Sequence, residues 1–240
     1  TLKSVLESAK KTIHIAVYEL DNAYIGDILE EALDRGVKVK ILFEGAPIPK
    51  IPEGELFIAR KLTKKGAEVS FYDDTKGRRN RKFSYFHNKY TVVDGERVIV
   101  GSNNYGNNGH PVETSYGNRE WELVIDDPRA AALYEAAFEA DSEIGDEWVE
   151  YGAAPEYTLK NKKYEENRAT RKGHYTLDLS PVEDRNVIIE TVFAPDNTLS
   201  ETTGILNAMS YAEHTVDIEQ LNFETYWGDK VYNPEKYHLA

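Results

Sequence analysis

The sequence contains no cysteine and only one methionine among its 240 residues. The lack of cysteine excludes disulfides, thiolate nucleophiles and cysteine-ligated metal sites, and it leaves the cellular compartment undecided. No apolar run approaches the roughly 18 to 20 residues that cross a bilayer as a helix. Because 40% of the residues are hydrophobic, a chain of this length can bury a core without disulfide or zinc staples. The composition therefore predicts a globular protein of one large or two small domains.

Basic residues are also scarce, with 29 Lys and Arg against 42 Asp and Glu and a net charge of −13. A protein that wraps duplex DNA over a broad face must neutralise many phosphates with cations. The net charge argues against binding of duplex DNA over a broad face. It is compatible with a small basic site within an acidic protein. One basic run, Lys76–Lys82 (KGRRNRK), either attracts phosphate groups or is a solvated loop that balances the acidic surroundings.

Apolar periodicity predicts an alternating order of helices and strands in the first 142 residues. Helices are expected over 3–10, 25–35, 53–65 and 128–141, and strands over 12–20, 37–43, 67–72, 89–94, 97–101 and 119–125. The early strand, helix, strand spacing predicts right-handed parallel crossovers, and the turn pair Asp94-Gly95 predicts a hairpin. We expect an α/β fold in which a mixed β-sheet is flanked by helices, with residues 1–145 as its first domain.

The pattern weakens after this domain and then partly repeats. Residues 146–185 show no clear period and are interpreted as a connecting excursion. Residues 211–218 (YAEHTVDI) then align with residues 8–15 (SAKKTIHI) at an offset of 203. This is either an internal duplication, in which 186–240 begins a second half, or two ordinary joints between a helix and a strand. In a duplication the equivalent of His87 would fall near position 290, beyond Ala240.

The residues with the clearest chemical meaning begin at His87-Asn88-Lys89. Alternate residues of a strand share a face, so His87 and Lys89 are expected to project together. Lysine supplies fixed positive charge to an anion, and a neutral histidine can attack or transfer a proton near neutral pH. The strand over 97–101 delivers Ser102 and Asn104 to the same end, where a hydroxyl and an amide can hydrogen-bond phosphate oxygens. Turn chemistry in an Asn-rich loop is the competing interpretation of that second pair.

A nucleophilic histidine needs an acceptor that holds its remote ring nitrogen and stabilises the imidazolium that develops. Glu120, near the head of the next predicted strand, is the candidate for this role. Glu122 shares its strand face, so the sequence leaves both carboxylates open.

The full spacing, HxK, four residues, Asp94, six residues, GSxN and then NxE, resembles the signature of the phospholipase D superfamily, also called the HKD-motif superfamily. The opening SAKKTIHIAVYELDNAYIGDILEEALDRGVKVKILFEG is similar to that family's first strand, helix and RGVxVxIL strand. The resemblance covers about residues 3 to 142 and resumes at about 187, where SYAEHTVDIEQLNFETYWGDKVYNP resembles the start of the second half of two-motif members. The chain is thus expected to be the N-terminal half of such a protein, with its second half truncated before the second motif.

The resemblance implies a role for each residue of the motif. His87 would attack phosphorus and become a phosphohistidine, while Lys89, Asn104 and Ser102 would bind the phosphoryl oxygens. Glu120 would orient His87. Asp94 is expected to be structural, tying the strand turn to its neighbours. The resemblance implies no metal and no cofactor, because lysine side chains supply the cations.

Members of the family work with two such motifs facing each other, and this chain holds one. A partner chain or a longer polypeptide would supply the second motif, and without it the chain is expected to be inactive. The expected activity is that of a phosphodiesterase or phosphatidyltransferase, hydrolase or transferase, acting on a phosphodiester such as a phospholipid head group. A nuclease of the same superfamily and a catalytically silent assembly module are the alternatives.

Overall fold

The computed structural model describes a folded α/β unit and a shorter stretch near the C-terminus. The described residues are 2–72, 83, 85–110, 117–143, 146–147, 189–194, 196, 200 and 202–218. The chain divides into two compact units, residues 1–187 and 188–240. The basic run 76–82 and residues 111–116 lie outside the described residues.

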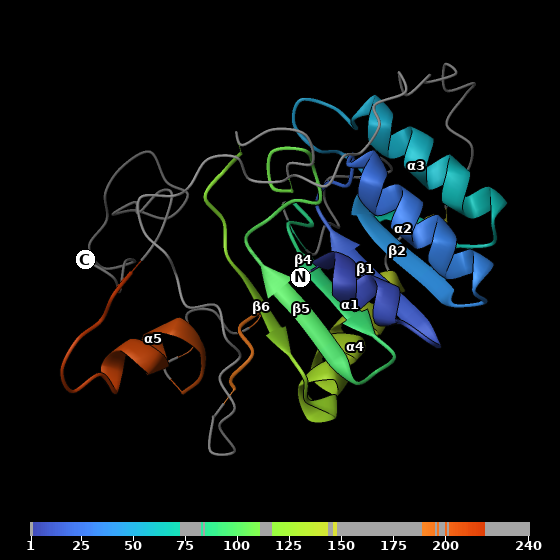
Figure 1. The fold of residues 1–240 in the computed structure, drawn as a ribbon. Coiled ribbons are helices and arrows are strands. Elements are labelled where there is room, and N and C mark those ends of the chain that lie inside the picture. The colour runs from blue at the N-terminus through green and yellow to red at the C-terminus, as the bar shows by residue number, and fades with distance from the viewer. Residues whose placement is uncertain are drawn as a thin grey trace, which may run out of the picture. The chain divides into compact units, whose positions relative to one another are not determined.

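The first unit is built on one seven-stranded mixed sheet with the strand order β6-β5-β4-β1-β2-β3-β7 (Figure 1). The strands are β1 (Thr12–Val17), β2 (Lys38–Glu44), β3 (Glu68–Tyr72), β4 (Lys89–Val93), β5 (Arg97–Gly101), β6 (Glu122–Ile125) and β7 (Asp146–Glu147). β1, β2 and β3 are parallel neighbours, and β4, β5 and β6 continue the sheet in antiparallel pairs. The expected parallel crossovers, hairpin and α/β fold class are confirmed.

Helices cover both faces of this sheet (Figure 1). They are α1 (Leu2–Ser8), α2 (Ala23–Asp34), α3 (Glu53–Lys64) and α4 (Pro128–Ser142). α1, α2 and α3 lie together on one face, whereas α4 lies behind the sheet against β5, β4 and β1. Alternation along β1 explains the division, because successive side chains point to opposite faces. Ile13, Ile15 and Val17 join the main core beneath α2, and His14 points to the α4 face.

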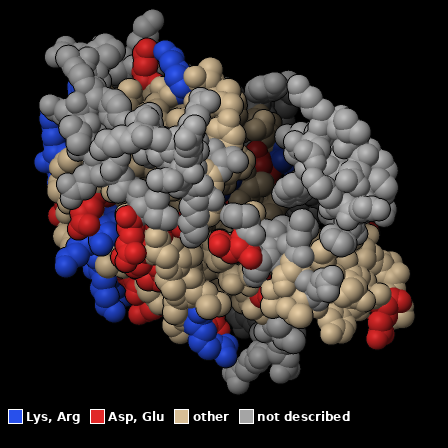
Figure 2. Space-filling view, turned by 180° about the vertical axis from the view of Figure 1, so that it is seen from behind, with Lys and Arg blue, Asp and Glu red and all other residues tan. Residues whose placement is uncertain are grey.

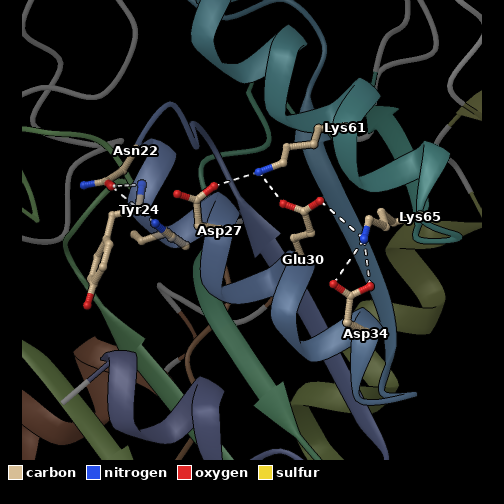
Figure 3. Close-up of polar contacts among 8 residues, drawn as sticks. Asn22, Tyr24, Asp27, Glu30, Asp34, Lys61 and Lys65 are labelled. Carbon is tan, nitrogen blue, oxygen red and sulfur yellow. Dashed lines mark hydrogen bonds and ion pairs between the residues drawn. The ribbon is translucent and has the colours of Figure 1, made fainter. Parts of the chain in front are cut away.

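Helix α2 is fixed at its start and along its side by polar contacts (Figure 3). The side chain of Asn22 accepts hydrogen bonds from the N–H groups of Tyr24 and Ile25, which caps the first turn. Along the helix, Lys61 of α3 contacts Asp27 at 2.7 Å and also pairs with Glu30. Lys65 continues this ladder to Glu30 and Asp34. These ion pairs join α2 to α3 on the outer side of the apolar core that the two helices share.

The turn between β4 and β5 is joined to the start of β1 by one carboxylate. Asp94 and Gly95 have φ of 57° and 68°, the left-handed conformation that such a tight turn requires. The carboxylate of Asp94 accepts hydrogen bonds from the backbone N–H groups of Lys10, Lys11 and Thr12 at 2.7 to 3.2 Å. Burial alone would raise the pKa of Asp94, but these N–H donors and the charge of Lys11 lower it below its usual value.

The structure corrects the sequence prediction at three places. β6 begins at Glu122 rather than at residue 119, because residues 119–121 precede the ladder with β5. The two-residue strand β7 pairs with β3 inside the segment that was expected to be a connecting excursion. In the second unit, helix α5 (Gly204–Ser210) precedes residue 211 as the repeat predicts, but residues 215–218 form no strand. Extended residues need a hydrogen-bonded neighbour to become a strand, and the described part of this unit offers none. A second half over 186–240 stays a prediction.

In the part of the chain that the structure describes, no helix combines the length and the apolar character needed to cross a membrane.

Replacing Asp94 by Asn should lower the free energy of unfolding by about 1–3 kcal/mol, because hydrogen bonds to a charged acceptor are lost at three N–H groups. The folded-state pKa of Asp94 is depressed, so its contribution is complete above its unfolded pKa and disappears as pH falls through the folded pKa. Urea unfolding of both proteins at pH 7 and at pH 3 measures this difference. Glu96→Gln is the matched control, since Glu96 lies in the same turn in an exposed pair with Lys11 and should change stability by less than about 0.5 kcal/mol. Equal stabilities of Asp94→Asn and Glu96→Gln at pH 7 would contradict the assignment.

Candidate active site

The motif residues gather where the end of β1 meets the start of β4. The two strands are antiparallel with Val17 opposite Lys89, so the residues after β1 lie beside the residues before β4. The N–H of Tyr18 donates to the carbonyl of Asn88 at 2.9 Å, which extends the pairing by one step. His87 and Lys89 are thereby held at one end of the sheet, next to Tyr18.

The aromatic ring of Tyr18 contacts both functional groups of the HxK pair. The ring centroids of Tyr18 and His87 are 4.6 Å apart in an edge-to-face arrangement, and the ammonium of Lys89 lies 5.4 Å from the Tyr18 centroid. The same ammonium donates a hydrogen bond to the carbonyl of His87 at 2.9 Å. The imidazole and the ammonium thus lie around one ring, and the cation is held in part by the face of an aromatic group.

This environment lowers the pKa of both residues. Partial burial, followed by the nearby charge of Lys89, lowers the pKa of His87, so the neutral imidazole is favoured at pH 7. Burial lowers the pKa of Lys89 to about 8, although the carboxylates of Glu120 and Glu19 act in the opposite direction. Around pH 7 the pair therefore combines an uncharged nucleophile with a protonated amine, the combination that attack on a phosphate anion needs.

Ser102 and Glu120 are brought together by an unusually close approach of β5 and β6. A Cβ atom on Gly101 would lie 2.3 Å from the carbonyl oxygen of Trp121, so glycine is required there. Just beyond Gly101, the hydroxyl of Ser102 donates to a carboxylate oxygen of Glu120 at 2.5 Å. The side-chain amide of Asn118 donates to the other oxygen at 3.2 Å. The backbone that approaches Gly101 is that of Trp121, the residue before β6.

Among the described residues, no hydrogen bond joins Glu120 to His87. The imidazole of His87 contacts the ring of Tyr18, and the carboxylate of Glu120 accepts from Ser102 and Asn118. Glu120 acts instead on Lys89, whose pKa it raises. Catalytic hydrogen bonds are often long in a protein without substrate, so the orienting role of Glu120 stays a prediction. Glu122 lies 3.4 Å from the Nε2 atom of His110, and burial raises the pKa of Glu122.

Asn104 follows β5 and lies near the end of β1, and among the described residues its amide makes no direct contact with His87. The next residue, Tyr105, donates its N–H to the carbonyl of Glu19 at 2.9 Å. The Oδ1 atom of Asn104 is buried and has no hydrogen-bond partner within the described ranges. A phosphate oxygen would accept from the Nδ2–H donors of this amide and not from Oδ1, so the binding of phosphate by Asn104 stays a prediction.

Sequence reasoning missed the acidic residues that surround the motif. Glu44, at the end of β2, is fully buried and accepts a hydrogen bond from the N–H of Phe86, the residue before His87. Glu19 and Asp21 follow β1, and burial raises the pKa of each. Glu55 is also fully buried and accepts the N–H of Leu20 at 2.7 Å. A glutamate at the end of a buried apolar strand, as in VKILFE, was the one signal available for Glu44.

His110 is a further titratable group that the motif did not include. Its pKa is lowered to about 4 by burial, which outweighs the opposing charge of Glu120. Its ring packs edge-on against Tyr105 with centroids 5.5 Å apart, and its carbonyl accepts from the side chain of Asn22 at 2.7 Å. These contacts tie the loop after β5 to the cap of α2, which keeps Ser102 and Asn104 at the motif end of the sheet.

A mixed sheet between helix layers, with a neutral histidine and a lysine cation at one sheet end, defines the phospholipase D-like class. The family model described as "Cardiolipin synthase, PLD-like domain" matches residues 2–142. The chain belongs to this phospholipase D-like family.

Individual relatives are distant. The chain is 23% identical over 141 residues to the mitochondrial cardiolipin hydrolase of Chlamydomonas reinhardtii, and the match covers 56% of this chain and 52% of that protein. The chain thus spans about half the length of this curated relative. The structure of Nuc, a phospholipase D family member from Salmonella typhimurium, superposes with a TM-score of 0.51 at 19% identity and covers 61% of this chain and 88% of Nuc. NucT from Helicobacter pylori gives a TM-score of 0.51 at 20% identity with the same two coverages. At these identities the solved structures support the fold alone.

Glu120→Gln should lower the pKa of Lys89 below about 8, because a carboxylate that favours the ammonium is neutralised while the hydrogen bond from Ser102 can be kept. Titration of the ¹³Cε signal of Lys89 by NMR measures the change. Glu122→Gln is the matched control, since the charges that act on Lys89 are those of Glu120 and Glu19. An unchanged pKa in Glu120→Gln, or equal changes in both variants, would contradict the geometry described above.

Proposed function

We propose that this protein cleaves or transfers phosphodiesters through a covalent phosphohistidine formed on His87. The observation that carries the proposal is the pairing of an imidazole, whose pKa is lowered, with a half-buried ammonium beside the same Tyr18 ring. Membership of the phospholipase D-like family supports a phosphoryl-transfer reaction.

In the proposed first step, a ring nitrogen of His87 attacks phosphorus and the bond from phosphorus to the leaving oxygen breaks. The leaving oxygen takes a proton, and the phosphoryl group stays on His87 as a phosphoramidate. Water or an alcohol then attacks the same phosphorus, gives up its proton and releases His87. Acceptance of water makes the reaction a hydrolysis, and acceptance of an alcohol makes it a transfer. Neither step needs a metal or a cofactor, because the amine supplies positive charge to the phosphoryl oxygens.

The other motif residues are assigned to phosphate binding and positioning. Lys89, Ser102 and Asn104 would hold the phosphoryl oxygens, and Lys89 would gain most in the transition state, where negative charge increases. Glu120 would keep Lys89 protonated through its charge and would orient His87 once substrate has drawn the groups together. Asp94 would act on the fold alone, through its hydrogen bonds to the start of β1.

A second HxK motif is proposed to protonate the leaving oxygen and to activate the acceptor. His110 and His14 cannot replace it by sequence context, because neither is followed by lysine two positions later. The pKa of His110, about 4, also leaves that residue without a proton to donate near pH 7. A second copy of the chain, or another polypeptide segment, would therefore complete the site.

A phospholipid is the proposed substrate. The family model and the Chlamydomonas relative both carry cardiolipin in their descriptions. The net charge of −13 disfavours extended contact with nucleic acid. In Figure 2, Lys and Arg side chains are interspersed with Asp and Glu over the described part of the face, which shows no broad basic surface.

An activated diester isolates the first step from the missing motif. p-Nitrophenolate leaves without protonation, so bis(p-nitrophenyl) phosphate should release one equivalent of nitrophenolate per chain at pH 7 in a burst that depends on His87. The burst is followed by absorbance, and the acid-labile adduct by mass spectrometry of the intact chain and its peptides. His87→Asn should abolish both, whereas His214→Asn, an exposed residue of the second unit, should retain both. Absence of a burst from the wild type and from its oligomers would favour a silent assembly module.

Competition against this burst identifies the substrate class. A short-chain phosphatidylglycerol should slow the burst several-fold at 200 mM salt, and a single-stranded 20-mer DNA should not. The nuclease alternative predicts the reverse, with inhibition by DNA that weakens tenfold or more between 50 and 200 mM salt, because phosphate contacts release counterions. Inhibition by DNA alone would overturn the lipid assignment while leaving the phosphohistidine in place.

A further inference from the structure

A second cluster of ligand-type side chains lies on the opposite face of the sheet from the HxK pair. His14 of β1 and Glu135 and Glu139 of α4 each place one ligand atom within 4.8 Å of the other two. Lys89 lies opposite Val17 and shares its face, whereas His14 is three residues from Val17 and faces the other way. The two groups are therefore separated by the sheet and by about 10 Å along β1.

His14 is unusual because it is buried and one of its ring nitrogens, Nδ1, has no hydrogen-bond partner among the described residues. Only 7% of the residue is exposed, and its Nδ1 atom makes no hydrogen bond of acceptable geometry with any described residue. That atom faces a carboxylate oxygen of Glu135 at ion-pair distance. A buried imidazole nitrogen and a carboxylate oxygen that face each other need a cation between them, either a proton or a metal.

The surrounding geometry fixes all three groups from rigid elements. The His14 ring stacks on Phe138 with centroids 5.1 Å apart and an interplanar angle of 16°. Glu135 and Glu139 are four residues apart on α4, so they lie on one face of the helix. Phe138 lies between them in sequence and holds the imidazole edge toward that face. One strand and one helix thus present three donors to a common point, with one side open because Glu139 is exposed.

We propose that His14, Glu135 and Glu139 bind a divalent transition-metal cation such as Zn²⁺. A neutral imidazole with two carboxylates balances a charge of +2, and three protein ligands with an open fourth position are typical of zinc. Ca²⁺ and Mg²⁺ fit less well, because they prefer oxygen ligands alone. The cation next to His14 in the sheet is Lys40 of β2, and its ammonium is paired with a different carboxylate, that of Glu68, at 3.4 Å. The metal would clamp α4 to β1, and it has no part in the reaction proposed at His87.

Isothermal titration of the full chain with ZnCl₂, after removal of metals with chelating resin, tests the site. The expected result is one Zn²⁺ per chain, with affinity at least tenfold weaker in Glu139→Gln and in Glu135→Gln. Glu143→Gln, an exposed residue one turn beyond Glu139, should bind as the wild type does. Bound Co²⁺ should give a visible absorption band that Glu139→Gln loses. Added Zn²⁺ should raise the midpoint of thermal unfolding in the wild type and the Glu143→Gln control.

The outcomes separate this site from its alternatives. His87→Asn should keep the full zinc affinity, and a loss there would place the metal at the HxK pair and overturn the proposal. If a proton fills the gap between His14 and Glu135, Glu139→Gln will bind zinc as the wild type does, which also overturns it. Because Glu139 is exposed, its variant should fold even if a change at the buried His14 does not. Absence of the nitrophenolate burst would leave this measurement unaffected.

Discussion

The partly desolvated ammonium of Lys89 is the constraint on which the site depends. Burying an ammonium is unfavourable unless other groups replace its water, and here the replacement comes from three directions. The Tyr18 ring, the carbonyl of His87 and the charge of Glu120 all act on it. Each belongs to a different segment of the chain, so the cation can be held only where the ends of β1 and β4 and the entry to β6 meet. A pKa of about 8 for Lys89 records an incomplete compensation. A phosphate anion would complete it, which links the cost of the buried charge to the proposed affinity for substrate.

The rest of the first unit maintains that meeting point. Asp94 fixes the far end of the hairpin to the start of β1, so the register that places Lys89 opposite Val17 is anchored at both ends. Glu44 holds the residue before His87 from the end of β2. Gly101 lets β6 approach β5 closely enough for Ser102 to reach Glu120. None of these three groups needs to touch a substrate, yet each determines where a reacting group lies.

Several carboxyl groups lie near the motif, and their pKa values are a property of the site that the net charge does not reveal. Near the end of β1, Glu55 is buried and Glu19 and Asp21 are half-buried, and burial raises the pKa of each. A raised pKa opposes the ionisation of these groups, although the charge of Glu19 still raises the pKa of Lys89. A small site that accepts an anion is therefore compatible with an acidic chain. The net charge allowed such a site, but the sequence did not indicate these carboxyl groups.

The sequence by itself determined the order of helices and strands in the first 142 residues, the hairpin at Asp94-Gly95 and the phospholipase D-like motif, because periodicity, turn chemistry and motif spacing are local properties of the chain. Tertiary structure decided what the spacing could not express. It brought Tyr18 into contact with both His87 and Lys89 and paired Ser102 with Glu120. Within the described residues it also gave residues 215–218 no strand partner. It also set His14 against Glu135 and Glu139, which are more than 120 positions away. Such contacts depend on strand register and on which face a helix covers, and both are fixed only when distant segments pack together.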